Sequence, residues 1–184
     1  MQNIVIWKGI YYQSLEYCSI KFSEEQLEVV STILGIHEGT EYKIDYTAIA
    51  KPNWEIVSCR IESRLREFVD VRTFRNDGEG NWTNNGQPIS ECKGCTYIDI
   101  SLTPFTNTLP INRSQMQVNE FRRIKVLYIN ILEQTIASVE QQYTKISDYK
   151  YQYENVPNDF EAEITVDKWG LVKEYPGLFI RLNG

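Results

Sequence analysis

The sequence predicts a mainly β protein built largely from antiparallel strands, and three observations support this class. The 184 residues include 21 Ile, 12 Val and 12 Tyr but only 4 Ala and 11 Leu, and β-branched and aromatic residues favour strands. Apolar and polar residues alternate in several segments, and turn-forming residues separate those segments. No linker, internal repeat or low-complexity tract interrupts the pattern, so we expect a single domain over residues 1–184.

The strand predictions rest on the spacing of apolar residues. Residues 42–50, 149–154 and 160–166 alternate between apolar and polar side chains, as in strands with one buried face. Residues 126–132 (VLYINIL) are apolar at nearly every position, which predicts a strand covered on both faces. Residues 135–146 fit a helical stripe as well as a strand, and we predict a strand because the neighbouring segments are strands.

Two turns have the composition of hairpin connections. Asn76-Asp77-Gly78 and Asp167-Lys168-Trp169-Gly170 contain residues that adopt the backbone conformations of tight turns. We therefore expect hairpins around Asp77–Gly80 and around Asp167–Gly170.

One short helix is predicted over residues 112–119. Asn112 is a suitable N-cap, Gln115 occupies the capping-box position, and Asn119 can end a helix in the left-handed conformation. The preceding segment, residues 103–111 (TPFTNTLPI), contains two prolines, which exclude it from the middle of a regular ladder. We expect it to form an extended, rigid connection.

The composition excludes several classes of protein. Lys and Arg number 19 against 25 Asp and Glu, a net charge of −6, and the isoelectric point is near 5.0, which argues against nucleic acid as the main partner. The mean hydropathy is −0.40, and no apolar run approaches the length of a membrane span. The first residues, MQNIVIWKGIYY, lack the features of a secretory leader, so we expect a cytoplasmic protein.

The cysteines do not predict a metal site. Cys92-Lys93-Gly94-Cys95 is a single C-x-x-C motif in a chain with four cysteines and one histidine, whereas structural zinc requires four ligands. We interpret this pair as part of a turn, and we expect no metal and no other cofactor.

The sequence also lacks the motifs of common enzymes. It contains no G-x-S-x-G, P-loop, G-x-G-x-x-G or H-E-x-x-H motif, and His37 lies between glycines in a predicted turn. A pair of carboxylates could perform acid–base chemistry, but the sequence does not fix their separations. The sequence therefore leaves an enzymatic function open but argues against it. We assign no catalytic residue.

Polar residues within apolar strands are more informative. Asp99 lies between Ile98 and Ile100 and faces away from them. In the segment that starts at Trp54, the even positions form a face with Trp54 and Arg60, and the odd positions form an apolar face. If the even face lines a concave surface, Trp54 and Arg60 project into it; the alternative is an ordinary solvent face.

Several motifs resemble those of the putative glycolipid-binding family of small bacterial proteins. The most specific blocks are residues 103–111 (TPFTNTLPI) followed by Arg113, and residues 167–178, which read D-x-x-G-L-V-x-x-Y-P-G-L. Further matches, in chain order, are Trp7, Glu16, Trp54, Arg60, Gly80-Asn81-Trp82, Asp99, Tyr143, Tyr151-Gln152-Tyr153 and Arg181. The resemblance extends over nearly the whole chain.

This resemblance implies a fold and a function. The implied fold is a spiral β-roll, a long antiparallel curled sheet wrapped around one short helix, similar in shape to bacterial lipoprotein carriers. The implied assembly is a homodimer. The implied function is binding of a glycolipid or another amphiphilic small molecule in the curved sheet, and the family supplies no catalytic residues.

Residues that match the family and carry polar or aromatic chemistry are the candidate ligand-binding residues. Aromatic rings offer flat faces to sugars, and charged groups bind hydroxyls or head groups. The candidates are Trp54, Arg60, Trp82, Asp99, Asn107, Arg113 and Tyr143. Each could instead be structural, for example through a buried Arg60–Asp99 or Arg113–Asp99 pair.

Three functions remain open at this stage. The first is a binding module with an apolar cavity and a polar mouth. The second is an enzyme that uses acid–base carboxylates. The third is an interaction protein, a dimer whose core is filled by side chains.

Overall fold

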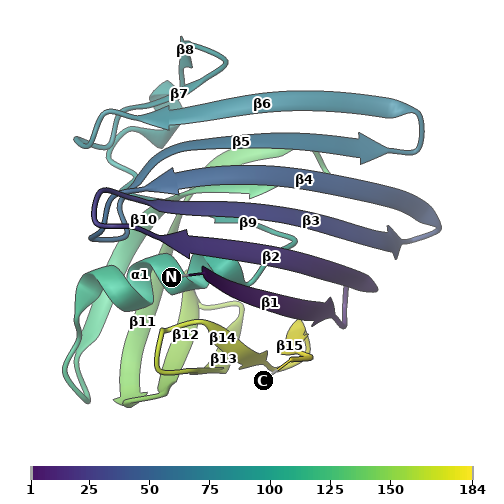
Figure 1. Ribbon diagram of the computed structural model, residues 1–184. Coiled ribbons are helices and arrows are strands. Elements are labelled where there is room, and N and C mark those ends of the chain that lie inside the picture. The colour runs from purple at the N-terminus through teal and green to yellow at the C-terminus, as the bar shows by residue number, and fades with distance from the viewer. Residues whose placement is uncertain (1, 184) are drawn as a thin grey trace.

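The computed structural model describes residues 2–183, which form one long sheet and one α-helix (Figure 1). The first half of the chain forms β1 (Gln2–Gly9), β2 (Ser14–Phe22), β3 (Leu27–His37), β4 (Thr40–Ala50), β5 (Ile56–Leu65), β6 (Phe68–Asn76), β7 (Trp82–Asn84) and β8 (Gln87–Pro88). A 3-10 turn, Ser90–Cys92, leads to β9 (Tyr97–Ile100) and α1 (Phe105–Ser114). The second half continues with β10 (Phe121–Asn130), β11 (Thr135–Ser147), β12 (Lys150–Val156), β13 (Glu161–Val166), β14 (Val172–Tyr175) and β15 (Phe179–Arg181).

The fifteen described strands form one sheet in the order β8-β7-β6-β5-β4-β3-β2-β1-β15-β14-β13-β12-β11-β10-β9. β8 and β9 lie at the two ends of the sheet, and most other neighbours along the chain pair as antiparallel hairpins. β1 pairs with β15 to join the two halves. Among the described strands, β9 and β10 form the one parallel pair, because α1 connects them as a crossover. The predicted class, a mainly β chain with one long, largely antiparallel sheet and one short helix, is confirmed.

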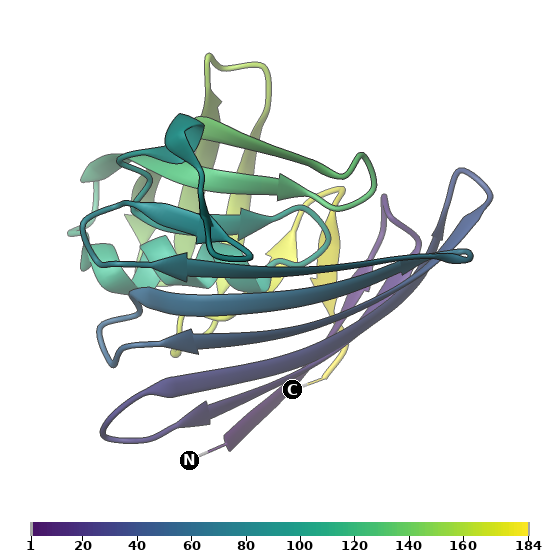
Figure 2. The same cartoon turned by 90° about the horizontal axis from the view of Figure 1, so that it is seen from above.

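The two halves of the sheet lie on opposite sides of α1. Strands β1–β6 form one long layer, and β9–β12 cross behind it with the helix between them (Figures 1 and 2). From the helix, Phe105 packs on Tyr46 of β4 with ring centroids 6.5 Å apart, and Asn107 bonds to Tyr143 of β11. The sheet is therefore bent around the helix, although it is not strongly curled.

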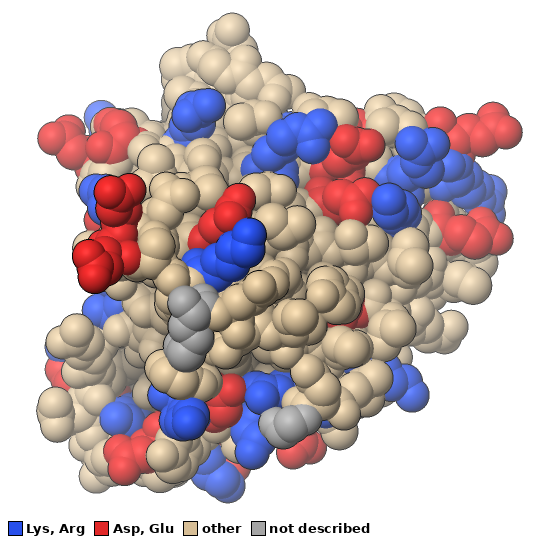
Figure 3. All heavy atoms as spheres, in the orientation of Figure 1, with Lys and Arg blue, Asp and Glu red and all other residues tan. Residues whose placement is uncertain are grey.

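The outer face of β1–β3 is unusually apolar. Leu15 and Leu34 lie opposite each other in the β2–β3 register, and Tyr17 and Val30 are exposed on the same face. Charged side chains gather instead over β4–β6, as Figure 3 shows. Exposed apolar patches of this kind are uncommon on monomeric proteins.

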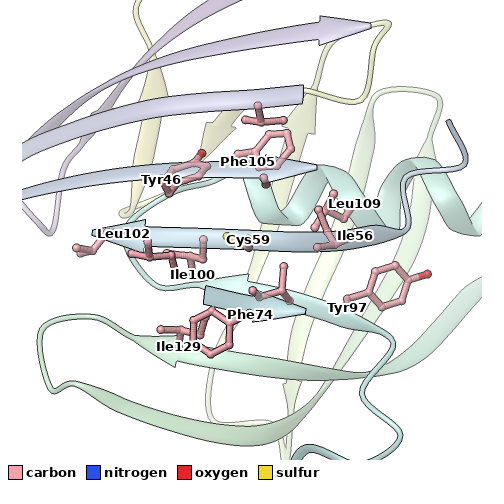
Figure 4. Packing of buried hydrophobic residues seen from close by; sticks show 14 of the residues in the cluster. Tyr46, Ile56, Cys59, Phe74, Tyr97, Ile100, Leu102, Phe105, Leu109 and Ile129 are labelled. Carbon is pink, nitrogen blue, oxygen red and sulfur yellow. The ribbon is translucent and has the colours of Figure 1, made fainter. Parts of the chain in front are cut away.

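The core joins the two layers. Side chains of β4–β6, such as Tyr46, Cys59 and Phe74, meet those of β9, α1 and β10, including Ile100, Phe105 and Ile129 (Figure 4). On β10, the adjacent residues Val126 and Leu127 are both buried, which confirms that this strand is covered on both faces. The predicted strand at 135–146 (β11) and both predicted hairpins, β6–β7 and β13–β14, are also confirmed.

The helix is displaced from its predicted position. It spans Phe105–Ser114, so residues 103–111, which we expected to be extended, are mostly helical, and residues 115–119 are not. Thr103 Oγ1 accepts the backbone N–H of Phe105 at 3.1 Å and starts the helix. Gln115, at φ +46°, ends it. Pro110 is tolerated inside the helix because tertiary packing buries residues 105–111 and overrides local propensity.

The structure decides between the two interpretations of the β5 faces, and the even positions form the ordinary solvent face. The odd positions Cys59 and Ile61 point into the core, whereas the even positions Arg60 and Arg64 are exposed on the outside. The concave side is therefore the apolar face. The sequence pattern identified the two faces correctly but did not identify which one was concave.

Candidate ligand-binding site

A pocket of about 500 Å³ opens where β9–β12 meet the β1–β2 and β14–β15 turns. Its floor includes Asp99 and Ile100 of β9 and Asn107 of α1, and its sides come from β10, β11, β12 and residues 155–160. This volume lies in the range of small-molecule sites. The pocket collects residues from distant parts of the chain, because the bent sheet brings the β1–β2 turn over β10–β12.

Aromatic side chains form much of the pocket wall. The rings of Tyr153, Phe160 and Tyr175 lie 5.8–6.2 Å apart, centroid to centroid. Tyr12 and Phe179 extend the wall, with their centroids 5.9 Å apart, and Tyr128 also lines the pocket. Burial raises the pKa of Tyr128 to about 12, so its hydroxyl stays protonated at neutral pH.

Asp99 is the charged group at the floor of the pocket. Thr106 Oγ1 donates to Asp99 Oδ1 at 2.7 Å, and Gln141 Nε2 donates to Asp99 Oδ2 at 2.7 Å. Burial raises the pKa of Asp99, and these two hydrogen bonds oppose the shift. The Arg60–Asp99 and Arg113–Asp99 pairs considered as a structural alternative do not form; neutral donors hold Asp99 in place.

Asn107 links the helix to the opposite wall. Its Nδ2 donates to the Tyr143 hydroxyl at 2.8 Å, and both residues are buried. Asn107 lines the pocket, and Tyr143 lies behind the wall against Tyr153, with ring centroids 5.3 Å apart. Burial raises the pKa of Tyr143 well above its ordinary value.

Of the predicted site residues, the structure brings Asp99, Asn107 and Tyr143 together. The other four lie elsewhere. Trp82 is buried and donates its Nε1 to the Cys95 carbonyl at 2.8 Å. Trp54 is half-buried against Phe22. Arg60 is exposed and pairs with Glu62 at 3.0 Å.

Arg113 is held at the end of the helix. Its Nη2 lies 2.9 Å from Glu55 Oε2, its Nη1 donates to the Thr96 carbonyl at 3.3 Å, and its guanidinium lies 5.4 Å from the Tyr97 ring centroid. Glu55 also pairs with Lys51 at 2.6 Å. The hydrogen bond from Lys51, together with the charge of Arg113, lowers the pKa of Glu55. These contacts tie the helix to the start of β5.

Behind the pocket lies a buried acid to which the sequence analysis assigned no role. Glu16 Oε1 accepts hydrogen bonds from Ser31, Tyr46 and Thr103 at 2.7–2.9 Å, whereas Oε2 is buried without a partner among the described residues. Burial raises the pKa of Glu16 to about 7, and the three hydrogen bonds oppose the shift. Thr103 lines the pocket and contacts Glu16, so it connects the two. The sequence signal was a charged residue in register with Cys18 and Ile20 on the apolar face of β2.

Most of the aromatic wall was also missed. The sequence places Tyr153 in an alternating strand and in a family match and Tyr175 in a family match, and no signal singles out Tyr12 or Tyr128. Alternation showed that such residues face inward, but no sequence pattern says which inward faces meet around a space.

A second hollow, of about 560 Å³, lies between β1 and the β13–β14 turn. Arg181 and Asp167 form an ion pair of 2.6 Å in its wall. Asp167 Oδ1 also accepts the backbone N–H groups of Trp169 and Leu171. These contacts hold the D-x-x-G-L turn and are structural, so the aromatic pocket is the better candidate site.

Three further findings on the described residues concern metal sites, disulfides and membrane-spanning helices. No group of three or more His, Cys, Asp or Glu side chains in residues 2–183 is placed to hold a metal ion. The four cysteines are free and buried. Of the helices that can be described, none is long and apolar enough to cross a membrane.

Comparison with known proteins agrees with the resemblance noted in the sequence. The family model described as "putative glycolipid-binding" matches residues 4–181, and the chain belongs to this family. The structure is similar to the crystal structure of a DUF1089 family protein from Pseudomonas aeruginosa at 1.80 Å resolution. That comparison gives a TM-score of 0.84 and 31% sequence identity over 92% of each chain. Comparison with curated proteins gave no match.

Proposed function

We propose that this protein binds an amphiphilic molecule, a glycolipid or a related lipid, and holds its head group in the aromatic pocket. One observation carries the proposal: six aromatic rings and the Asp99 carboxylate surround a space of about 500 Å³. Aromatic faces pack against sugar rings, and carboxylate, amide and hydroxyl groups bond to sugar hydroxyls. The family description supports the same ligand class.

Within this proposal, the bent sheet corresponds to the spiral β-roll of the family, with a likeness in shape to lipoprotein carriers. The protein acts as a cytoplasmic carrier or sensor rather than an enzyme. Two copies associate through the apolar outer face of β1–β3, which includes Leu15, Tyr17, Val30 and Leu34.

Native mass spectrometry of freshly purified protein, followed by organic extraction, tests the proposal directly. We expect a bound species that is recovered in the extract as a lipid or glycolipid. In parallel, the protein is titrated by calorimetry with octyl β-glucoside below its micelle concentration, and we expect saturable binding.

A matched pair of variants tests whether the ligand binds in the aromatic pocket. Leu178 lines the pocket and is half-buried, so Leu178→Trp fills part of the space and should weaken binding about tenfold or more. Leu182 is exposed and does not line the pocket, so Leu182→Trp should bind as the unaltered chain does. Absence of saturable binding by the unaltered chain, or equal binding by both variants, would overturn the proposal.

A further inference from the structure

The charges around the aromatic pocket all have one sign. Its lining residues include the acids Asp99, Glu140 and Asp159, and none of the lining residues, all within the described part of the chain, is Lys, Arg or His. A pocket that bound an anionic head group, such as a phosphate or a uronate, would normally present Arg or Lys to it.

The protein leaves these negative charges without cationic partners. Within residues 2–183, Asp99, Glu140 and Asp159 form no ion pair within 4.0 Å. Asp99 accepts hydrogen bonds from the neutral side chains of Thr106 and Gln141, and Asp159 accepts a hydrogen bond from the neutral Asn155 amide. Asp99 is half-buried, whereas Glu140 and Asp159 are exposed. The cost of a carboxylate without a cation therefore falls mainly on Asp99, and a cationic ligand would relieve that cost.

The nearby basic residues are turned elsewhere. Lys125 lies opposite Glu140 in the β10–β11 register, but its ammonium donates to the Lys93 carbonyl at 3.0 Å. His37 contacts the Tyr12 ring, with centroids 5.7 Å apart, and does not line the pocket. The charged groups of the pocket lining are therefore all carboxylates, and they make the electrostatic potential in the pocket negative.

The aromatic wall favours the same sign of ligand. Aromatic faces attract ammonium groups, and Tyr153, Phe160 and Tyr175 cluster on the side of the pocket that also carries Asp159. Two independent features, uncompensated carboxylates and aromatic faces, therefore favour a positive charge in one space.

We infer that the pocket selects a cationic head group, such as an amino sugar or another ammonium group, over a neutral one, and rejects an anionic one. The inference rests on the proposed function, because it names the class of head group that this site prefers. It also excludes an acidic glycolipid or a phospholipid phosphate from the pocket.

Three octyl glycosides with the same chain test the inference: the glucoside, the 2-amino-2-deoxyglucoside and the glucuronide. They are titrated below their micelle concentrations near pH 7, at low and at high salt. We expect the amino sugar to bind most tightly and the glucuronide most weakly, with about a tenfold or larger difference between these two. Added salt should narrow the difference.

Variants of the acidic residues test whether the preference for a cationic head group depends on their charges. Asp99→Asn and Glu140→Gln each remove one charge at nearly constant size, and each should reduce the ratio of amino-sugar to glucuronide affinity. Glu140 is exposed, so its variant remains a test if Asp99→Asn folds poorly. Glu62→Gln, on the outer face of β5, is the control and should leave the ratio unchanged.

The outcomes separate this inference from the proposed function. If none of the three glycosides binds, the proposed function fails. If the neutral glucoside binds but all three bind equally, or the glucuronide binds best, the charge preference is overturned while the proposed function stands. The charge preference would also be overturned if the ratio of amino-sugar to glucuronide affinity were unchanged in both Asp99→Asn and Glu140→Gln.

Discussion

Glu16 is a buried acid whose charge state is coupled to folding. One of its oxygens accepts three hydrogen bonds, and the other is buried without a partner among the described residues. Burial raises the pKa of Glu16 from 4.5 to about 7. The folded protein therefore holds this proton more tightly than the unfolded chain does.

The sign of the pH dependence follows from this difference. Below pH 4.5 both states are protonated and the stabilising contribution is complete; as the pH rises to about 7, the unfolded chain loses its proton first and the contribution is lost. A pKa difference of this size corresponds to about 3 kcal/mol. Glu16→Gln cannot titrate, and its carbonyl oxygen can accept the same three hydrogen bonds.

We therefore expect Glu16→Gln to gain stability relative to the unaltered chain as the pH rises from 4.5 to 8. Urea unfolding of both proteins at several pH values measures this difference, and comparing the two cancels groups such as Asp45, whose pKa is lowered. A stability difference that stays constant, or that changes in the opposite direction, would contradict the assignment.

Arg113 stabilises the fold through Glu55 rather than through Asp99. Glu55 is buried, and removal of the Arg113 guanidinium leaves its Oε2 without that partner while Lys51 still pairs with Oε1. We expect Arg113→Ala to lower the free energy of unfolding by about 2–4 kcal/mol. Arg60→Ala, which removes an exposed pair with Glu62, should cost less than about 1 kcal/mol. Similar losses for the two variants in urea unfolding would refute the structural role of Arg113.

At the scale of elements, the helix depends on Thr103. Its hydroxyl accepts the N–H of Phe105 at 3.1 Å and donates to Glu16 at 2.9 Å, so one side chain starts the helix and anchors it to β2. Valine has the same shape without the hydroxyl. We expect Thr103→Val to destabilise the protein by about 1–2 kcal/mol.

Thr96 supplies the control for this prediction. It is exposed, and its hydroxyl makes only a long bond of 3.5 Å to the Lys125 carbonyl. Thr96→Val should therefore change the melting temperature very little, whereas Thr103→Val should lower it clearly. Equal melting temperatures would show that the Thr103 hydroxyl does not support the helix.

The strands could be predicted from the sequence, and the helix could not. Alternation identified β4, β12 and β13 because one face of each strand is buried. The helix at Phe105–Ser114 has two prolines in or next to it and no favourable local pattern. It forms because the two halves of the sheet bury it, and that contact exists only in the folded molecule.

The same limit applies to the candidate site. The position of Asp99 in an apolar strand correctly indicated an unusual carboxylate, and Asn107 lies near it. The partners of Asp99, Gln141 and Thr106, are 42 and 7 residues from it along the chain, and no local sequence pattern connects them. Trp82 and Arg113 match the family pattern, and in this structure their contacts are structural. A family match alone therefore did not separate structural from ligand-binding positions.

At the scale of the whole molecule, the bent sheet has two unlike faces. The inner face surrounds the helix and the pocket, and the outer face of β1–β3 exposes Leu15, Tyr17 and Leu34, each about half exposed. Burial of such a patch against a second copy would remove apolar surface from water on both molecules. The charged outer face of β4–β6 would remain in solvent.

Light scattering after size-exclusion chromatography tests this assembly. We expect twice the chain mass of 21.6 kDa for the unaltered protein and the single mass for Leu34→Glu, because the added carboxylate would have to lose its water against the apolar surface of the second copy. Val71→Glu, on β6 and outside the patch, should leave the dimer intact.

Since the pocket opens on the inner side of the sheet, the monomeric variant should still bind octyl glycosides. A single mass for the unaltered protein at tens of micromolar, or dissociation by Val71→Glu instead of Leu34→Glu, would exclude this face as the interface.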